Sequence, residues 1–198
     1  MRQFLVVGHD APTTAEFSLD DLPGAGRLDL LARAVVAGLL RSHGVRADAR
    51  VHLVLADTYT LVVDGATVRH LRPDERSTAA RVRDALEARD DAIGAMPAEP
   101  SPGVKLYRGG LAPALSRAAA DADAVVVLDA EGDPVADVES PERPLFVLSD
   151  HHDFRSSDRE AVAEHDPRAL SLGPVALHAD QAITVAHNWL DTDGFERY

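Results

Sequence analysis

The sequence Ala124-Val125-Val126-Val127-Leu128, with the later runs Leu145-Phe146-Val147-Leu148 and Leu170-Ser171-Leu172, decides the fold class of this chain. Each run is short and apolar, and segments with helical spacing follow near 157–164 and 179–190. Short apolar strands that alternate with helices are typical of a parallel sheet covered on both faces. The sequence therefore predicts an α/β fold with a mostly parallel sheet and helices on both faces.

The first half of the chain is expected to extend this sheet. Leu28, Leu31, Val35 and Leu39 repeat at helical spacing, and Gly44 would end that helix. The other predicted elements are a strand at 3–8, a buried strand at 51–55, a hairpin over 61–68 that turns at Asp64-Gly65, a helix at 77–92 with Ser77 as its N-cap, and a helix at 111–120. A Pro-rich loop near 94–104 would separate the two halves of one domain, 1–198.

The charge balance of the chain has two interpretations. There are 33 acidic residues against 20 basic ones, for a net charge of −13, and Lys105 is the only lysine. Such a chain should repel nucleic acid in dilute salt, and DNA is not an expected partner. Alternatively, this is the acidic surface of a halophile. The Debye length is about 3 Å at 1 M salt, so local arginine clusters would still act there. We favour the second interpretation.

Composition also narrows the location and the chemistry. No apolar run approaches the roughly 20 residues that span a bilayer, and the N-terminus is too short for a signal peptide. We therefore expect a cytoplasmic protein with no membrane partner. The absence of cysteine excludes disulfides, thiolate metal ligands and a cysteine nucleophile.

Three loops should leave the carboxyl ends of the predicted strands, where ligands of open α/β sheets usually bind. They are Leu128–Gly132, Leu148–His152 and Ser171–Leu177, and each contains small or turn-forming residues. None matches a GxGxxG or P-loop pattern, which argues against a dinucleotide or triphosphate site. On spacing alone, three ordinary connecting loops remain the alternative.

A family resemblance favours a binding site. It is carried by Ala11-Pro12-Thr13-Thr14, by Phe17–Asp29 with Asp21-Leu22-Pro23-Gly24-Ala25-Gly26-Arg27 inside it, and by Ser171-Leu172-Gly173-Pro174 through Ile183. These stretches resemble the SPOUT methyltransferases, and within them the archaeal tRNA pseudouridine-54 N1-methyltransferase family, over nearly the whole chain. The resemblance implies S-adenosylmethionine (SAM) as methyl donor, a deep C-terminal trefoil knot, a homodimer, and tRNA as substrate.

The resemblance also implies which residues surround the cofactor. They are Leu128, Ser149, Leu172, Gly173, Pro174, Val175, Ala176, Leu177 and Ala182. Similar sequences often carry cysteine where this chain has Ala182, so a backbone contact survives there and a thiol role does not. For each aliphatic residue, simple core packing is the alternative.

Methylation at N1 requires an aligned acceptor that loses a proton, which a nearby carboxylate could accept. Asp21 and Asp150 are the candidate bases, and Arg27 and Asp20 the candidate substrate-binding residues. The alternatives are solvated surface acids and a salt bridge from Arg27 to Asp20, Asp21 or Asp29. No metal is expected, because His151-His152-Asp153 and the pair His178 and His187 lack the spacing of metal-binding helices.

Two other functions remain open. One is N1-methylation of pseudouridine in ribosomal RNA. The other is a non-catalytic RNA-binding or ribosome-assembly factor that has kept the fold. SAM binding separates the second from both methyltransferases.

Overall fold

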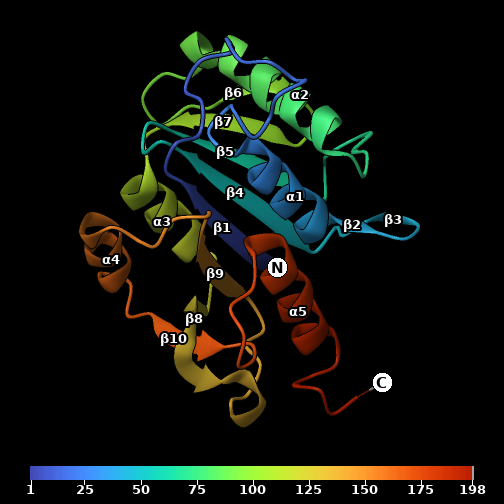
Figure 1. Cartoon of the computed structure of the whole chain (residues 1–198), viewed down its shortest axis with the longest axis vertical. Coiled ribbons are helices and arrows are strands. Elements are labelled where there is room, and N and C mark those ends of the chain that lie inside the picture. Colours follow the sequence, from blue (N-terminus) through green and yellow to red (C-terminus); the bar gives the residue numbers. More distant parts are fainter. Residues whose placement is uncertain (198) are drawn as a thin grey trace.

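The computed structural model describes residues 1–197 and is built round one eight-stranded sheet (Figure 1). In sheet order the strands are β10 (Arg168–Ser171), β8 (Ala124–Pro134), β9 (Pro144–Ser149), β1 (Arg2–Gly8), β4 (Ala49–Leu55), β5 (Tyr59–Asp64), β7 (Val104–Arg108) and β6 (Ala98–Ser101). The strands from β10 to β4 pair in parallel. The last three join antiparallel. The predicted mostly parallel α/β sheet is confirmed, and the antiparallel extension is new.

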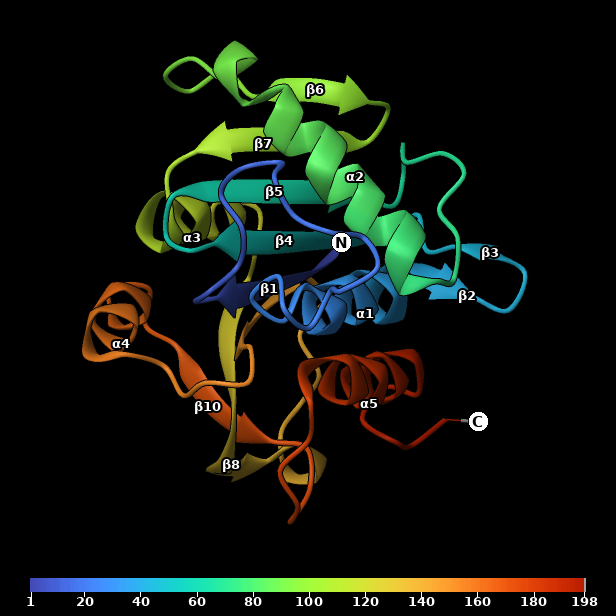
Figure 2. The same ribbon diagram turned by 45° about the horizontal axis from the view of Figure 1, so that its top comes forward.

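Helices cover both faces of this sheet, as predicted (Figure 2). One face carries α1 (Leu28–Leu39), α2 (Glu75–Glu87) and α5 (Ala179–Asp191), and the other carries α3 (Leu111–Ala119) and α4 (Ser156–Ala163). Two 3-10 turns, η1 (Arg89–Asp91) and η2 (Val135–Asp137), and a small hairpin, β2 (Leu40–Arg41) and β3 (Gly44–Val45), complete the chain. No helix in the described part of the chain is both long and apolar enough to cross a membrane.

The central strand β1 shows why two helical layers form. Its apolar side chains alternate between the faces, so Phe4 enters one core and Leu5 the other. Phe4 stacks on Phe146 with ring centroids 5.2 Å apart, and Phe146 meets Trp189 of α5 at 6.4 Å. All three rings are fully buried. This aromatic column joins α5 to the middle of the sheet.

Two expectations for the first helices were wrong in detail. The α1 helix ends at Leu39 because Leu40 is already extended, and Gly44 lies in the β2–β3 hairpin. The α2 helix begins earlier than predicted, with Asp74 as its N-cap and Ser77 inside it. The Asp74 carboxylate accepts a hydrogen bond from the Ser77 amide at 2.7 Å, which satisfies a free N–H at the helix start.

The hairpin and the Pro-rich loop were also misplaced. The hairpin joins β4 to β5, and it turns through Ala56 and Asp57, both in the left-handed region at φ 42° and 50°. Asp64 ends β5 instead of opening a turn between paired strands. The β6 strand lies within the expected 94–104 loop, and it pairs with β7, which begins at the end of that loop, to form a hairpin at the outer edge of the sheet.

Candidate functional site

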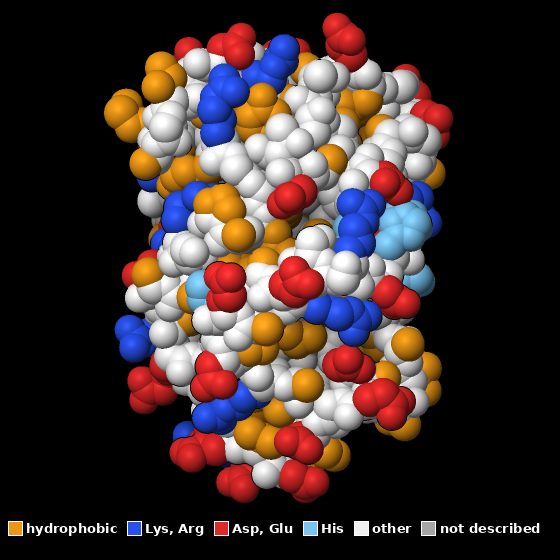
Figure 3. Space-filling view, turned by 90° about the vertical axis from the view of Figure 1, so that its left-hand side faces the viewer, with side chains coloured by type: hydrophobic (Ala, Val, Ile, Leu, Met, Phe, Trp, Pro, Cys, Tyr) orange, Lys and Arg blue, Asp and Glu red, His pale blue; other side chains and the backbone are white. Residues whose placement is uncertain are grey.

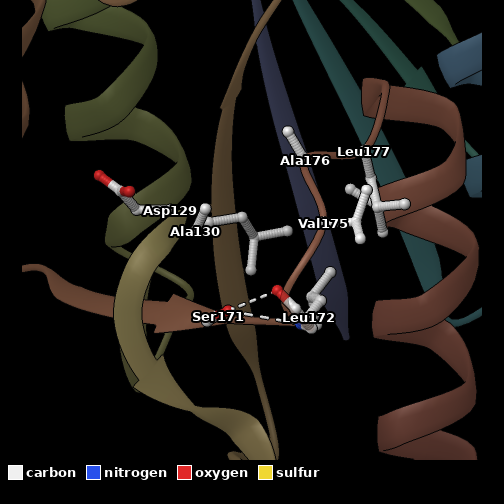
Figure 4. Close-up of a pocket in the computed structure, with 10 residues that line it drawn as sticks. Asp129, Ala130, Ser171, Leu172, Val175, Ala176 and Leu177 are labelled. Carbon is white, nitrogen blue, oxygen red and sulfur yellow. Dashed lines mark hydrogen bonds between the residues drawn. The ribbon is translucent and has the colours of Figure 1, made fainter.

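A pocket opens beside the middle of β8, where the pairing with β10 is interrupted (Figure 4). Ala169 of β10 lies opposite Val127, but the next residue, Leu170, lies opposite Asp133. Residues 128–132 therefore bulge out of the ladder. Gly132 permits this, because a Cβ there would lie 2.6 Å from the backbone at Ala169 and Leu170. The bulge carries one wall of the pocket.

The opposite wall is the loop that leads from β10 to α5. The Ser171 hydroxyl donates to the Gly173 carbonyl at 3.0 Å, which fixes the start of this loop (Figure 4). Further along, Val175 and Leu177 are 70% and 40% exposed, which is unusual for large apolar side chains. The hollow has a volume of about 60 Å³, smaller than the roughly 300 Å³ of a typical small-ligand pocket.

Seven of the nine predicted cofactor residues line this one pocket: Leu128, Leu172, Gly173, Val175, Ala176, Leu177 and Ala182. Ser149 and Pro174 are not in its lining, and the Ser149 hydroxyl is bonded to the His152 carbonyl instead. Asp129, Ala130 and Ser171 complete the lining and were not predicted individually. Their position in the two quoted loops was the signal that could have identified them.

A second hollow, the acceptor groove, lies along the loop between β1 and α1. It has a volume of about 350 Å³ and is lined by Asp10, Pro12, Glu16, Phe17, Ser18, Asp21, Gly24, Ala25 and Gly26. Gly26 is required for this shape, because its φ is +61° and a Cβ there would lie 1.8 Å from the Asp10 carbonyl oxygen. The Asp21 carboxylate is exposed at this groove and accepts a hydrogen bond from the Gly24 amide at 3.0 Å.

The two predicted substrate-binding residues lie beside this groove but already have partners. The Arg27 guanidinium makes two hydrogen bonds of 3.0 Å to Asp29, and its side chain stays 37% exposed. The alternative expected for Arg27, a salt bridge, is therefore present. The outer edge of the Arg27 guanidinium is still open to a ligand. Asp20 pairs with Arg76 and is 83% exposed. Arg27 holds the pKa of the Asp29 carboxyl below its usual range.

Asp150, the other candidate base, is buried in a cluster that the sequence did not reveal. Its carboxylate accepts hydrogen bonds from the His9 amide at 2.8 Å and the His152 amide at 2.9 Å, and it contacts His9 Nδ1 at 3.0 Å. His9 Nε2 contacts Asp158 at 2.9 Å. The side chain of Asp150 is only 1% exposed. We call His9, Asp150 and Asp158 the imidazole bridge, since it joins β1, β9 and α4.

Burial and hydrogen bonding compete within the imidazole bridge. Burial alone would lower the pKa of His9, but the hydrogen bonds to Asp150 and Asp158 outweigh it and the pKa is raised. Burial would likewise raise the pKa of Asp150, but the hydrogen bonds from His9 and two amides lower it. Both shifts favour an imidazolium between carboxylates. A general base needs access to its proton and a pKa near the working pH, so this geometry favours a structural role for Asp150.

One group of histidines meets the distance criterion for a metal site. Ligand atoms of Asp10, His151 and His152 lie within 4.8 Å of one another, and all three residues are exposed. His152 Nε2 already contacts Asp10 at 2.9 Å. Exposed groups of this kind are common without an ion, and the expectation of a metal-free protein stays a prediction.

Comparison with known proteins defines the class. Residues 1–195 match the family described as putative SAM-dependent RNA methyltransferase, and the chain belongs to this family. The fold agrees with that membership. The crystal structure of Archaeoglobus fulgidus Nep1 bound to S-adenosylhomocysteine has a similar fold, with a TM-score of 0.67 at 11% identity over 96% of this chain and 97% of that one.

The names of relatives within the family are more specific than the description of the family. The tRNA (pseudouridine(54)-N(1))-methyltransferase of Haloferax volcanii is 58% identical over the whole of both chains. The proteins of the same name from Haloarcula marismortui and Methanopyrus kandleri are 56% and 39% identical, over 100% and 96% of this chain and 100% and 93% of theirs. The haloarchaeal relatives agree with the halophilic interpretation of the acidic, lysine-poor composition.

Proposed function

We propose that this chain transfers a methyl group from SAM to N1 of pseudouridine 54 in the T-loop of tRNA. The observation that carries the proposal is the single pocket that unites seven predicted cofactor residues at the carboxyl edge of the sheet. A full-length relative that is 58% identical and is named tRNA (pseudouridine(54)-N(1))-methyltransferase supports the substrate.

The chemistry of the pocket fits a SAM-sized nucleoside. Its lining is apolar or small except for Asp129 and Ser171, which suits an adenine between aliphatic side chains. Leu128 and Leu172 would lie against the ring, and backbone groups of the 172–177 loop would hydrogen-bond its edge. When bound, SAM supplies an electrophilic methyl group on its sulfonium sulfur. Closure of Val175 and Leu177 over the ligand would remove their exposed apolar surface from water.

Binding of the acceptor and removal of its proton are assigned to the acceptor groove. The bond from the methyl carbon to sulfur breaks as the bond to N1 forms, and the N1 proton must leave. Asp21 is the better placed of the two candidate bases because its carboxylate is exposed in the groove, whereas the Asp150 carboxylate is enclosed. The open edge of Arg27 would grip a phosphate or a uracil oxygen. Alignment of acceptor and donor contributes much of the acceleration.

Three further features belong to this proposal. A trefoil knot in the C-terminal part is supported by the sheet order, in which β10 lies outside β8 while α5 returns to pack on α1. We also infer a homodimer and a cytoplasmic location, which the family resemblance implies. Exposed Val175 and Leu177 support the dimer, because an apolar surface of this kind is often covered by a partner.

A single-turnover assay in molar KCl tests the proposal. Purified protein and labelled SAM are mixed with matched tRNAs that carry uridine or pseudouridine at position 54. We expect label only in the pseudouridine tRNA. SAM binding without transfer to either tRNA would direct attention to ribosomal RNA. Neither transfer nor SAM binding would leave the non-catalytic RNA-binding alternative. SAM at 100 times its dissociation constant should stabilise the fold by about 2.7 kcal/mol.

A further inference from the structure

A third hollow lies far from the pocket, on the antiparallel part of the sheet. The α2 side of β4, β5 and β7 is apolar, but residues of the other side form a cleft beside α3. The cleft has a volume of about 330 Å³ and is lined by Arg50, His52, Val62, Asp64, Thr67, Gly103, Lys105, Tyr107, Arg117 and Asp121. We call it the α3 cleft. Its size falls in the range of ligand sites, and its walls carry three cationic side chains.

The cations of the α3 cleft differ in how they are neutralised. Arg50 pairs with Asp64 at 2.9 Å and with Asp121 at 3.6 Å. Lys105 pairs with Glu99 at 3.1 Å. Arg117 forms no ion pair within the described residues, and its Nη2 is buried without any hydrogen-bond partner.

Several exposed arginines also form no ion pair in the part of the chain that the structure describes, but Arg117 differs from them because a nitrogen of its guanidinium is buried. Arg117 is held with its guanidinium carbon 4.4 Å from the centre of the Tyr107 ring, a cation–π contact that fixes its plane. Burial lowers the pKa of Arg117. Burying a cation that keeps a free hydrogen-bond donor costs free energy unless an anion pairs with it. A planar guanidinium matches the oxygens of a phosphate in geometry.

The floor of the cleft is neutral and rigid. His52 Nε2 contacts the side-chain oxygen Oε1 of Gln3 at 2.9 Å, and the side-chain nitrogen Nε2 of Gln3 donates to the backbone carbonyl of Ala118 in α3 at 2.9 Å. Burial, with the nearby charges of Arg50 and Arg117, lowers the pKa of His52 to about 3. His52 is therefore uncharged at neutral pH.

We propose that the α3 cleft binds a backbone phosphate of the substrate RNA, with Arg117 as the principal contact and Lys105 as the second. This inference rests on the proposed function for the identity of the RNA. The only lysine of the chain lies in this cleft. The face shown in Figure 3 carries acidic side chains over its whole height, with basic side chains as isolated groups between them, so it offers no continuous basic surface.

The position of the cleft determines what the contact would do. Arg50 lies near the start of β4, whereas the pocket lies at the bulge in the middle of β8, three strands away in the sheet. A phosphate held in the α3 cleft would therefore belong to the body of the RNA and not to the target nucleotide. In molar salt the Debye length is about 3 Å, so only direct contacts of this kind add to affinity. The contact should tighten RNA binding and leave the chemical step unchanged.

The test compares Arg117→Met, Lys105→Gln and the control Arg83→Gln, which removes a charge from α2 on the other side of the sheet. Binding of pseudouridine-54 tRNA is measured by fluorescence anisotropy at several KCl concentrations, with thermal unfolding to check the fold. Arg117→Met should raise the tRNA dissociation constant about tenfold and reduce the slope of log K against log salt by about one. Lys105→Gln should have a smaller effect in the same direction, and Arg83→Gln should have neither.

Three results would overturn the inference. The first is an unchanged dissociation constant and salt slope in folded Arg117→Met and Lys105→Gln proteins. The second is an equal effect of Arg83→Gln, which would indicate general charge. The third is loss of stabilisation by inorganic phosphate in Arg117→Met without any change in tRNA binding, which would indicate a site for a free anion. Because the readout is binding, a protein that binds tRNA through Arg117 but fails to methylate it would contradict the proposed function alone.

Discussion

The pocket and the acceptor groove lie at the same edge of the sheet but differ in what shapes them. Backbone shapes the pocket, and charged side chains border the groove. The pocket has one charged residue in its lining, Asp129, and owes its shape to a strand bulge and a loop. The groove is flanked by the imidazole bridge and by the pair of Arg27 and Asp29. Substitutions that move backbone should therefore damage cofactor binding, and substitutions that change charge should damage the groove and respond to pH.

The largest expected effect is at the imidazole bridge, among the charged residues that flank the groove. Asp150→Asn should lower the free energy of unfolding by about 3 kcal/mol, because it leaves a buried imidazolium with one of its two carboxylates. Chemical denaturation at pH 6 measures the change. Asp153→Asn, an exposed acid in the same loop, is the matched control and should have almost no effect. Equal stabilities for the two variants would show that the imidazole bridge does not stabilise the fold.

The pH dependence of this difference has a defined sign. The pKa of His9 is raised, so its contribution is complete below the unfolded value of about 6.5 and is lost as pH rises through the higher folded value. The pKa of Asp150 is lowered, so its contribution is present above about 4 and is lost as pH falls through the folded value. The gap between wild type and Asp150→Asn should thus be widest between about pH 4 and 6.5 and should narrow in alkali.

The next largest effect is at the strand bulge, where backbone shapes the pocket. Gly132→Val should cost about 2 kcal/mol of stability and weaken SAM binding at least tenfold, because the new side chain forces β8 away from β10 at the bulge. Calorimetric titration with SAM measures it. Gly44→Val is a suitable control, since nothing lies within 4 Å of a Cβ there. A Gly132→Val protein with normal SAM affinity would separate the bulge from the cofactor site.

The same contrast explains what could be predicted from sequence. The parallel strands were found because their apolar runs are continuous, and the pocket residues came from a family resemblance to contiguous loops. The β6 strand, with Pro100 inside it, has no strand-like pattern, and the turn at Ala56 and Asp57 lacks glycine. The imidazole bridge joins residues 141 and 149 positions apart, so no local pattern could indicate it.

A moderate effect is expected at the rim of the groove. Arg27 has a φ of 57°, so Arg27→Asn keeps a residue that tolerates the left-handed region, and it removes the guanidinium together with its ion pair to Asp29. It should raise KM for tRNA about tenfold while SAM affinity is unchanged. Steady-state methylation with each substrate varied separately measures this. Arg41→Asn, in the exposed β2–β3 hairpin, is the control. A fall in SAM affinity would mean that the groove and the pocket are not independent.

The smallest expected effect tests the backbone character of the pocket. Ala182 is 6% exposed in the first turn of α5 and lines the pocket. If the ligand is held there by backbone and shape, Ala182→Cys adds one sulfur atom and no necessary contact. SAM affinity and the rate of methyl transfer should then stay within about threefold of wild type, because small changes of volume in a core are well tolerated. A large gain in either quantity would assign a function to the thiol.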